Sequence, residues 1–233
     1  MKKLLIIFAK FPLAGSVKTR LARSIGKQNA AFFYRCALAQ IVEKFTHSSH
    51  AFDVQVAVAQ ENRVNVFRKL YPGASAYFAQ TPHANLGGRM QTAISYGLRN
   101  KYDSVAVIGT DCPHLPVSTV QQAFERLHAH DVVIGPASDG GYYLLAVKNE
   151  HPCLFENIEW STERVFGQTQ HAATKAGLSM SLLPELYDVD VIDDLRRLLR
   201  DFPEFFERFE TEYSASAREI STLLRGEHSD SLF

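Results

Sequence analysis

Short apolar runs alternate with amphipathic helical patterns along most of the chain, and this alternation limits the possible folds more than any other feature. The runs lie at 4–9, 54–59, 76–80, 104–109 and 132–137, each rich in β-branched or aromatic residues and bounded by turn residues. Helical patterns lie between them at 27–46, 61–70, 89–100 and 118–129, the last with Ser118 as its expected cap. Such an order predicts an α/β fold with a mostly parallel sheet and helices on both faces.

The second half of the chain adds elements to this pattern. A run at 142–148 follows the fifth strand through a tight Asp-Gly-Gly turn, which predicts an added hairpin strand and therefore a mixed sheet. A helix at 162–176, a strand at 179–184 and helices from 191 onward complete the expected fold. Because 233 residues suit one core, we expect a single domain over 1–226, with 227–233 as a disordered tail.

Overall charge and apolar content exclude several classes of partner. Lys plus Arg and Asp plus Glu number 25 each, which gives no general attraction to nucleic acid or to an anionic membrane. The apolar runs are much shorter than a bilayer span, and the start MKKLLIIFAKFP has no small-residue cleavage site. We therefore expect a cytoplasmic protein with no nucleic-acid or membrane partner.

Two loops after expected strands suit the binding of phosphate, because ligands of such sheets bind beyond the carboxyl ends of the strands. Lys18 and Arg20 follow the first strand and stand at an expected helix start. The loop is not a P-loop, since Pro12 and Val17 occupy positions where that motif needs glycine. A surface turn with two solvated cations remains the alternative for this loop.

The loop after the third strand has similar properties. Gly87 and Gly88 precede Arg89 at an expected helix start, where backbone N–H groups converge on an anion.

Carboxylates follow the later strands. Asp111 lies where the fourth strand gives way to a turn, and Asp139 lies in the turn after the fifth. Asp188 and Asp190 precede the last helical pattern. An Asp-Gly turn explains Asp139 as well as a functional role does. Asp190 has helix capping as its structural alternative, and for Asp188 a structural role is favoured. Asp111 and Asp190 suit a hard divalent cation that stabilises a diphosphate in a transfer reaction.

The ordered segments KFPLAGSVKTRLA, LGGRM, IGTDCPHL, GPASDGGYYLL, IEWST and YDVDVIDDL resemble the bacterial DUF2064 family over about residues 1–200. The resemblance implies a GT-A fold, a nucleotide-diphosphate-sugar donor and a divalent metal. It further implies that Asp111 and Asp190 bind Mg²⁺ or Mn²⁺ and that Lys18 contacts phosphate. The usual Asp-X-Asp signature is replaced by Gly109-Thr110-Asp111, a form that also resembles the molybdenum-cofactor and lactate guanylyltransferases.

The leading hypothesis is a metal-dependent glycosyltransferase with a nucleotide-sugar donor and a small-molecule acceptor. Asp111 and Asp139 are the candidate catalytic residues, Asp139 by orienting or deprotonating an acceptor hydroxyl. The candidate nucleotide and phosphate contacts are Lys10, Pro12, Gly15, Lys18, Arg20, Gln80, Gly87, Arg89 and Thr110. The candidate acceptor or sugar pocket consists of Gly140, Gly141, Tyr142 and Trp160.

Two other functions fit the same residues. A nucleotidyltransferase would join a nucleotide to a phosphorylated small molecule and release pyrophosphate. A catalytically silent module would bind a nucleotide without turnover. One aspartate, one lysine and a metal serve either transfer equally well, so the residues alone leave the reaction class open.

Overall fold

The computed structural model describes residues 1–47, 51–82 and 84–209, and these group into two compact units. Unit 1 comprises Met1–Phe11 and Gln40–Asp188, and unit 2 comprises Pro12–Ala39 and the described part of Val189–Phe233. The helix α2, Lys27–His47, contributes residues to both units. The expected tail at 227–233 lies outside the described residues.

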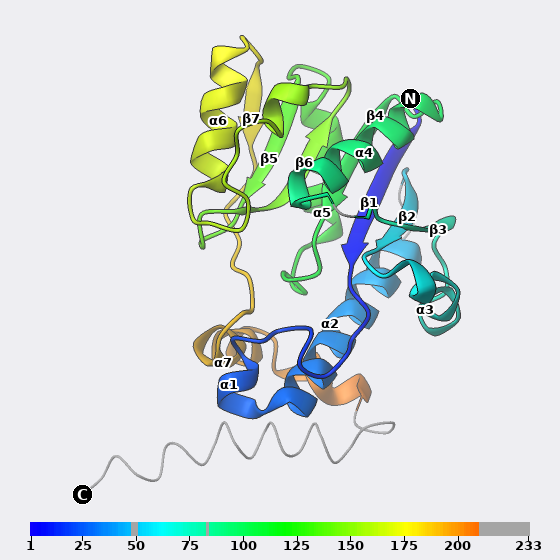
Figure 1. Ribbon diagram of the computed structural model, residues 1–233, viewed down its shortest axis with the longest axis vertical. Coiled ribbons are helices and arrows are strands. Elements are labelled where there is room, and N and C mark those ends of the chain that lie inside the picture. Colours follow the sequence, from blue (N-terminus) through cyan, green and yellow to red (C-terminus); the bar gives the residue numbers. More distant parts are fainter. Residues whose placement is uncertain (48–50, 83, 210–233) are drawn as a thin grey trace, which may run out of the picture. The chain divides into compact units, whose positions relative to one another are not determined.

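Unit 1 is built on a seven-stranded sheet with the order β3-β2-β1-β4-β6-β5-β7 (Figure 1). The pairs β1–β2, β1–β4, β2–β3 and β5–β7 are parallel, whereas β6 is antiparallel to β4 and β5. The strands are β1 Lys3–Ala9, β2 Asp53–Val58, β3 Ala76–Ala79, β4 Ser104–Ile108, β5 Val132–Pro136, β6 Tyr142–Val147 and β7 Met180–Leu182. The mostly parallel mixed sheet predicted from the sequence is confirmed, including its hairpin strand.

Helices connect the strands of unit 1. The α-helices are α3 Val64–Leu70, α4 Leu86–Arg99, α5 Val117–Arg126 and α6 Val165–Lys175, with 3₁₀ turns at Glu61–Arg63 and Pro152–Leu154. No helix in the described ranges combines the length and the apolar character that crossing a bilayer requires.

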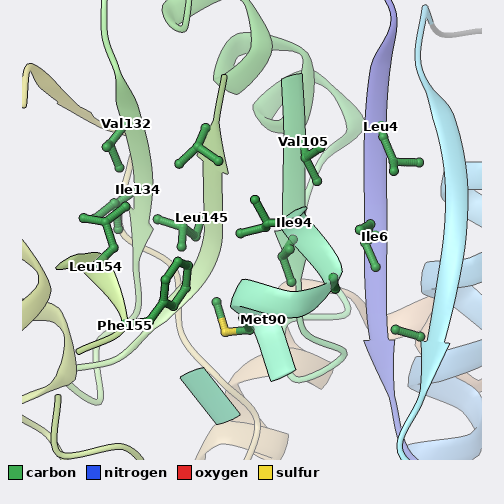
Figure 2. Close-up of a cluster of buried hydrophobic side chains, with 14 of the residues drawn as sticks. Leu4, Ile6, Met90, Ile94, Val105, Val132, Ile134, Leu145, Leu154 and Phe155 are labelled. Atoms are coloured by element: carbon green, nitrogen blue, oxygen red, sulfur yellow. The ribbon is translucent and has the colours of Figure 1, made fainter. Parts of the chain in front are cut away.

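Alternate residues of the strands pack against helices on opposite faces of the sheet, as the twofold repeat of a strand requires. Figure 2 shows Leu4 and Ile6 of β1 in one cluster with Met90 and Ile94 of α4. On the other face, the Lys3 ammonium lies 5.8 Å from the ring centroid of Phe124 in α5. Helices therefore cover both faces, as predicted.

Three predicted helix starts were wrong, including that of α6, which begins at Val165 and not at 162. α5 begins at Val117 with Pro116 as its N-cap residue, so Ser118 lies inside the first turn and is not the cap. α4 begins at Leu86, three residues before the predicted start at Arg89, because the Asn85 side chain caps it. Short polar side chains such as Asn satisfy the first backbone N–H groups of a helix and so fix its start.

Unit 2 has its own small core. Its elements are α1 Ala22–Ile25, the first half of α2, α7 Ile192–Asp201 and a 3₁₀ segment at Pro203–Phe209. Phe32 stacks on Phe206 with ring centroids 5.9 Å apart, and the Phe33 and Phe205 centroids are 5.7 Å apart. These aromatic pairs join two segments that are far apart in the sequence.

Candidate functional site

Asp111 lies on a short loop directly after β4. Gly109 is exposed, Thr110 is buried, and Asp111 is half-buried. A Cβ atom on Gly109 would lie 3.8 Å from Asp111 Oδ2, so the carboxylate turns back toward the carboxyl end of the strand. This is the edge of the sheet at which ligands of parallel α/β proteins bind.

The loop that carries Asp111 is tied to two other segments of unit 1. The Cys112 thiol donates to Asp188 Oδ1 at 2.8 Å and lies 3.3 Å from the Tyr187 carbonyl oxygen. The Lys44 ammonium donates to the carbonyl oxygens of Pro113 and Leu115 at 2.8 and 3.1 Å, and burial lowers the pKa of Lys44 to about 8. These contacts fix the backbone on which Asp111 is carried.

Gln80 connects the carboxyl ends of three strands to α4. It is buried, and its Nε2 donates to the carbonyl oxygens of Ala57 at 2.9 Å and Ala9 at 3.5 Å. Its Oε1 accepts from Arg89 Nη1 at 3.0 Å. The structure therefore brings together the predicted contacts Gln80 and Arg89, with Gln80 holding the guanidinium in place.

The N-terminus of α4 packs directly against an indole ring. Asn85 Oδ1 accepts from the Gly88 amide at 2.9 Å, which caps the helix. A Cβ atom on Gly87 would lie 2.2 Å from Cε2 of Trp160, closer than any real contact allows. Gly87 is thus required here by the close approach of Trp160.

Trp160 belongs to an aromatic cluster next to the hairpin of β5 and β6. Its ring lies edge-on to Tyr142, with centroids 6.4 Å apart, and is stacked with Phe155 at the same distance. Burial raises the pKa of the Tyr142 hydroxyl, so this group stays protonated at neutral pH. Tyr142 and Trp160 thus lie together, packed against the hydrophobic core, and their assignment to an acceptor or sugar pocket stays a prediction.

The hairpin turn holds the predicted carboxylate Asp139 in an exposed position. Asp139 Oδ1 accepts from the Gly141 amide at 2.8 Å, which is the geometry of an Asx turn. Gly140 has φ +87°, and a Cβ atom there would lie 2.1 Å from the Glu163 carbonyl oxygen. Asp139 therefore shapes the turn, and its catalytic role stays a prediction.

Lys18, Arg20 and Asp190 form a charge cluster within unit 2. The Lys18 ammonium lies 2.9 Å from Asp190 Oδ1, and Arg20 Nη1 lies 3.8 Å from Oδ2. The Lys18 side chain is 3% exposed, whereas that of Arg20 is 63% exposed. Lys18 has φ +46°, a left-handed conformation that is uncommon for a residue with a Cβ atom.

Asp190 does not cap α7. Asp194 Oδ2 accepts from the backbone amides of Asp190 and Val191, both at 2.9 Å, so Asp194 satisfies the start of this helix. The capping explanation for the Asp190 side chain is therefore wrong, because that carboxylate pairs with Lys18 and Arg20. Its assignment as a metal ligand stays a prediction.

The remaining predicted contacts lie in both units. Lys10 is exposed directly after β1 in unit 1, whereas Pro12 is buried and Gly15 exposed in unit 2. Gly15 has φ +82°, which explains the need for glycine in this loop.

A divalent cation fits the residues at the end of β4. In the described part of the chain, no group of three or more His, Cys, Asp or Glu side chains is arranged as a metal site. Mg²⁺, however, is commonly held by one or two carboxylates together with substrate phosphates. Asp111 is a half-buried carboxylate on a fixed loop, which is the donor such a cation needs.

Asp188 makes a structural contact, the kind of role that the sequence favoured for it. Its carboxylate accepts from the thiol of the residue after Asp111, which ties it to the same loop. The segment YDVDVIDDL gives no sign of this contact, because Cys112 lies 76 residues away in the sequence.

Comparison with known proteins identifies a family and one clear structural relative. The family described as "Uncharacterized protein conserved in bacteria (DUF2064)" matches residues 44–162. A protein from Desulfovibrio desulfuricans, provisionally assigned as a nucleotide-diphospho-sugar transferase, has 31% sequence identity and a TM-score of 0.84. The match covers 96% of this chain and 97% of the other. No curated protein matches the chain.

Two more distant structures share the fold. A cytidylyltransferase from Leptospira borgpetersenii has 15% identity and a TM-score of 0.53, covering 92% of this chain and 96% of its own. CMP:2-keto-3-deoxy-manno-octonic acid synthetase, solved with CTP, has 14% identity and a TM-score of 0.51, covering 88% and 99%. Identities this low support the common fold alone.

Proposed function

Because the chain belongs to the DUF2064 family of bacterial proteins, we propose that it is a metal-dependent glycosyltransferase that uses a nucleotide-diphosphate-sugar donor and a small-molecule acceptor. The observation that carries the proposal is the 31% identity, over nearly the whole of both chains, to a provisionally assigned nucleotide-diphospho-sugar transferase. The position of Asp111 at the carboxyl end of β4 supports it.

Asp111 would hold Mg²⁺ or Mn²⁺ together with donor phosphate oxygens, and the cation would neutralise charge on the departing diphosphate. The contacts of Lys44 and Cys112 keep the loop of Asp111 fixed before substrate arrives. A fixed carboxylate needs no reorganisation during the reaction, which is how electrostatic stabilisation becomes effective.

The acceptor is proposed to bind at the aromatic cluster of Tyr142, Phe155 and Trp160. Aromatic faces and edges with a few polar groups are typical of small-molecule pockets. Asp139, exposed at the adjacent turn, is proposed to orient or deprotonate the acceptor hydroxyl. Tyr142 does not take that role, because burial raises the pKa of its hydroxyl.

Nucleotidyl transfer is the second candidate function. The segment Gly109-Thr110-Asp111 supplies one carboxylate where many glycosyltransferases supply two. In that reaction an acceptor oxygen attacks the α-phosphorus of a triphosphate and pyrophosphate leaves. The two reactions thus give different products whatever the acceptor is.

The products of the full-length protein test the choice. The protein is incubated with Mn²⁺ and a panel of nucleotide sugars, and separately with nucleoside triphosphates and sugar phosphates. We expect slow release of a nucleoside diphosphate from at least one nucleotide sugar and no pyrophosphate from the second mixture. Asp111→Asn should abolish the release.

Asp103→Asn is the matched control, because Asp103 is an exposed carboxylate immediately before β4, at the opposite end of the strand from Asp111. Its release rate should equal that of the unmodified protein. Pyrophosphate in the second mixture with no turnover of nucleotide sugars would replace the proposal by nucleotidyl transfer. Binding without product in either mixture would support a silent module.

A further inference from the structure

We propose that Asp190 acts as a built-in competitor for phosphate, because it occupies the Lys18 ammonium when no ligand is bound. The inference rests on the proposed function, which gives Lys18 a phosphate of the donor to bind. Under this proposal Asp190 does not bind a metal but lowers the affinity of Lys18 for that phosphate.

Lys18 and Asp190 form a close ion pair. The Lys18 ammonium donates to Asp190 Oδ1 at 2.9 Å, a distance typical of a charge-assisted hydrogen bond. The Lys18 side chain is 3% exposed and that of Asp190 is 36% exposed. The carboxylate holds one of the three N–H donors of an ammonium that is almost fully covered, so a phosphate that reaches Lys18 competes with Asp190 for it.

Lys18, Arg20 and Asp190 together carry a net positive charge. Lys18 and Arg20 contribute two positive charges, and Asp190 contributes one negative charge. Arg20 Nη1 lies 3.8 Å from Asp190 Oδ2, and 63% of the Arg20 side chain is exposed. The cluster keeps one excess positive charge with an accessible guanidinium, which gives an incoming diphosphate a first contact before it competes for Lys18.

The backbone of Lys18 has an uncommon conformation. Its φ of +46° places it in the left-handed region, which costs energy for a residue with a Cβ atom. The Lys18 carbonyl oxygen accepts from the Ala22 amide at 2.8 Å, so the same residue also starts the helical turn that follows. The Lys18 backbone is thus fixed at the start of this turn, which limits where its side chain can move away from Asp190.

The test uses inorganic pyrophosphate as the probe, in EDTA, with affinity measured by calorimetry on the full-length chain. Metal is excluded so that ligation of a cation by Asp190 cannot affect the result. Asp190→Asn should bind pyrophosphate at least fivefold more tightly than the unmodified protein. Lys18→Met should bind it at least tenfold more weakly, and the double variant should match Lys18→Met.

Asp193→Asn is the matched control. Asp193 lies in the first turn of α7, three residues after Asp190. It is 81% exposed and pairs with Arg196 at 2.9 Å, so Asp193→Asn makes the same change in net charge without removing a partner of Lys18. We expect less than a twofold change in its pyrophosphate affinity. Circular dichroism establishes that each variant is folded, and Asp190→Ser supplies a second replacement of different size.

The inference is overturned if Asp190→Asn and Asp190→Ser bind pyrophosphate no more tightly than Asp193→Asn. It is also overturned if the gain persists in the Lys18→Met background, since the gain would then not act through Lys18. The proposed function is judged separately by product release. A protein that turns over nucleotide sugars without this affinity pattern contradicts only the inference, and the reverse result contradicts only the proposed function.

Discussion

Gly87→Ala should destabilise the protein, although alanine is the better helix former. The new Cβ atom would lie 2.2, 2.3 and 2.4 Å from Cε2, Cζ2 and Nε1 of Trp160, so the indole must move. Overpacking of this kind costs about 1–3 kcal/mol, against a helix gain of up to about 1 kcal/mol. The difference lies between about 0 and 3 kcal/mol; we expect a net loss near the middle of this range, about 1.5 kcal/mol, which lowers Tm by about 3–6 °C in a domain of this size.

Gly167→Ala provides the matched control, because Gly167 lies within α6 and a Cβ atom there would meet nothing within 4 Å. It should stabilise the protein by about 0.5–1 kcal/mol through helix propensity alone. Thermal and urea unfolding followed by circular dichroism measure both variants. Trp160 is the single tryptophan of the chain, so its fluorescence reports the displacement in Gly87→Ala directly.

A double-mutant cycle identifies the cause. In a Trp160→Ala background the clash is absent, so Gly87→Ala should become neutral or stabilising by up to about 1 kcal/mol. The reasoning is refuted if Gly87→Ala stabilises the unmodified protein as much as Gly167→Ala does. A loss of equal size in the Trp160→Ala background would also refute it, since the loss would then have no connection to the indole.

Three further predictions concern the charged residues. Asp111→Asn should leave the free energy of unfolding unchanged but remove Mn²⁺-dependent nucleotide binding, measured by calorimetry, because the amide lacks the charge that holds a hard cation. Undiminished binding would contradict the assignment of Asp111 as a metal ligand. Lys18→Ala should weaken nucleoside diphosphate binding by about 1.5–3 kcal/mol and hardly affect the nucleoside, whereas equal losses for both ligands would exclude a phosphate contact. Burial lowers the pKa of Lys44 from 10.5 to about 8 in the folded protein. Between pH 8 and 10.5 the unfolded chain therefore binds more protons than the folded protein. The free energy of unfolding should rise with pH across this range, by up to about 3 kcal/mol. Comparison of urea unfolding at pH 7.5 and 10 should show this rise reduced in Lys44→Met, and an identical pH dependence in the two proteins would contradict it.

The sheet was predictable from the sequence because its signals are local. Runs such as 104–109 and 132–137 are apolar, β-branched and bounded by turn residues, and each forms a strand within a residue or two of its predicted ends. The Asp-Gly-Gly turn after β5 likewise predicts the antiparallel strand β6. The place of β6 between β4 and β5 was not predictable, because strand order depends on packing between segments distant in sequence.

The residues of the candidate site stay predictions, and the structure adds the contacts that they make. Asp111, Gly87 and Trp160 were chosen because they follow strands or occur in motifs, and the structure places Trp160 directly on Gly87. The thiol contact between Cys112 and Asp188 joins positions 76 residues apart, and no local pattern encodes it. The starts of α4 and α5 were predicted at Arg89 and Ser118 because Asn85 and Pro116 were not considered as N-cap residues.

The division of unit 2 between two distant segments has a consequence for folding during synthesis. The last strand of the sheet, β7, ends at Leu182, whereas Asp190 and the aromatic residues 205 and 206 emerge from the ribosome later. Lys18 is therefore synthesised 172 residues before its counter-ion. Closing so long a loop is entropically costly, and proteins rich in such long-range contacts fold slowly. The Lys18–Asp190 pair should accordingly form among the last native contacts, so a nascent chain can complete its sheet before the charge cluster exists.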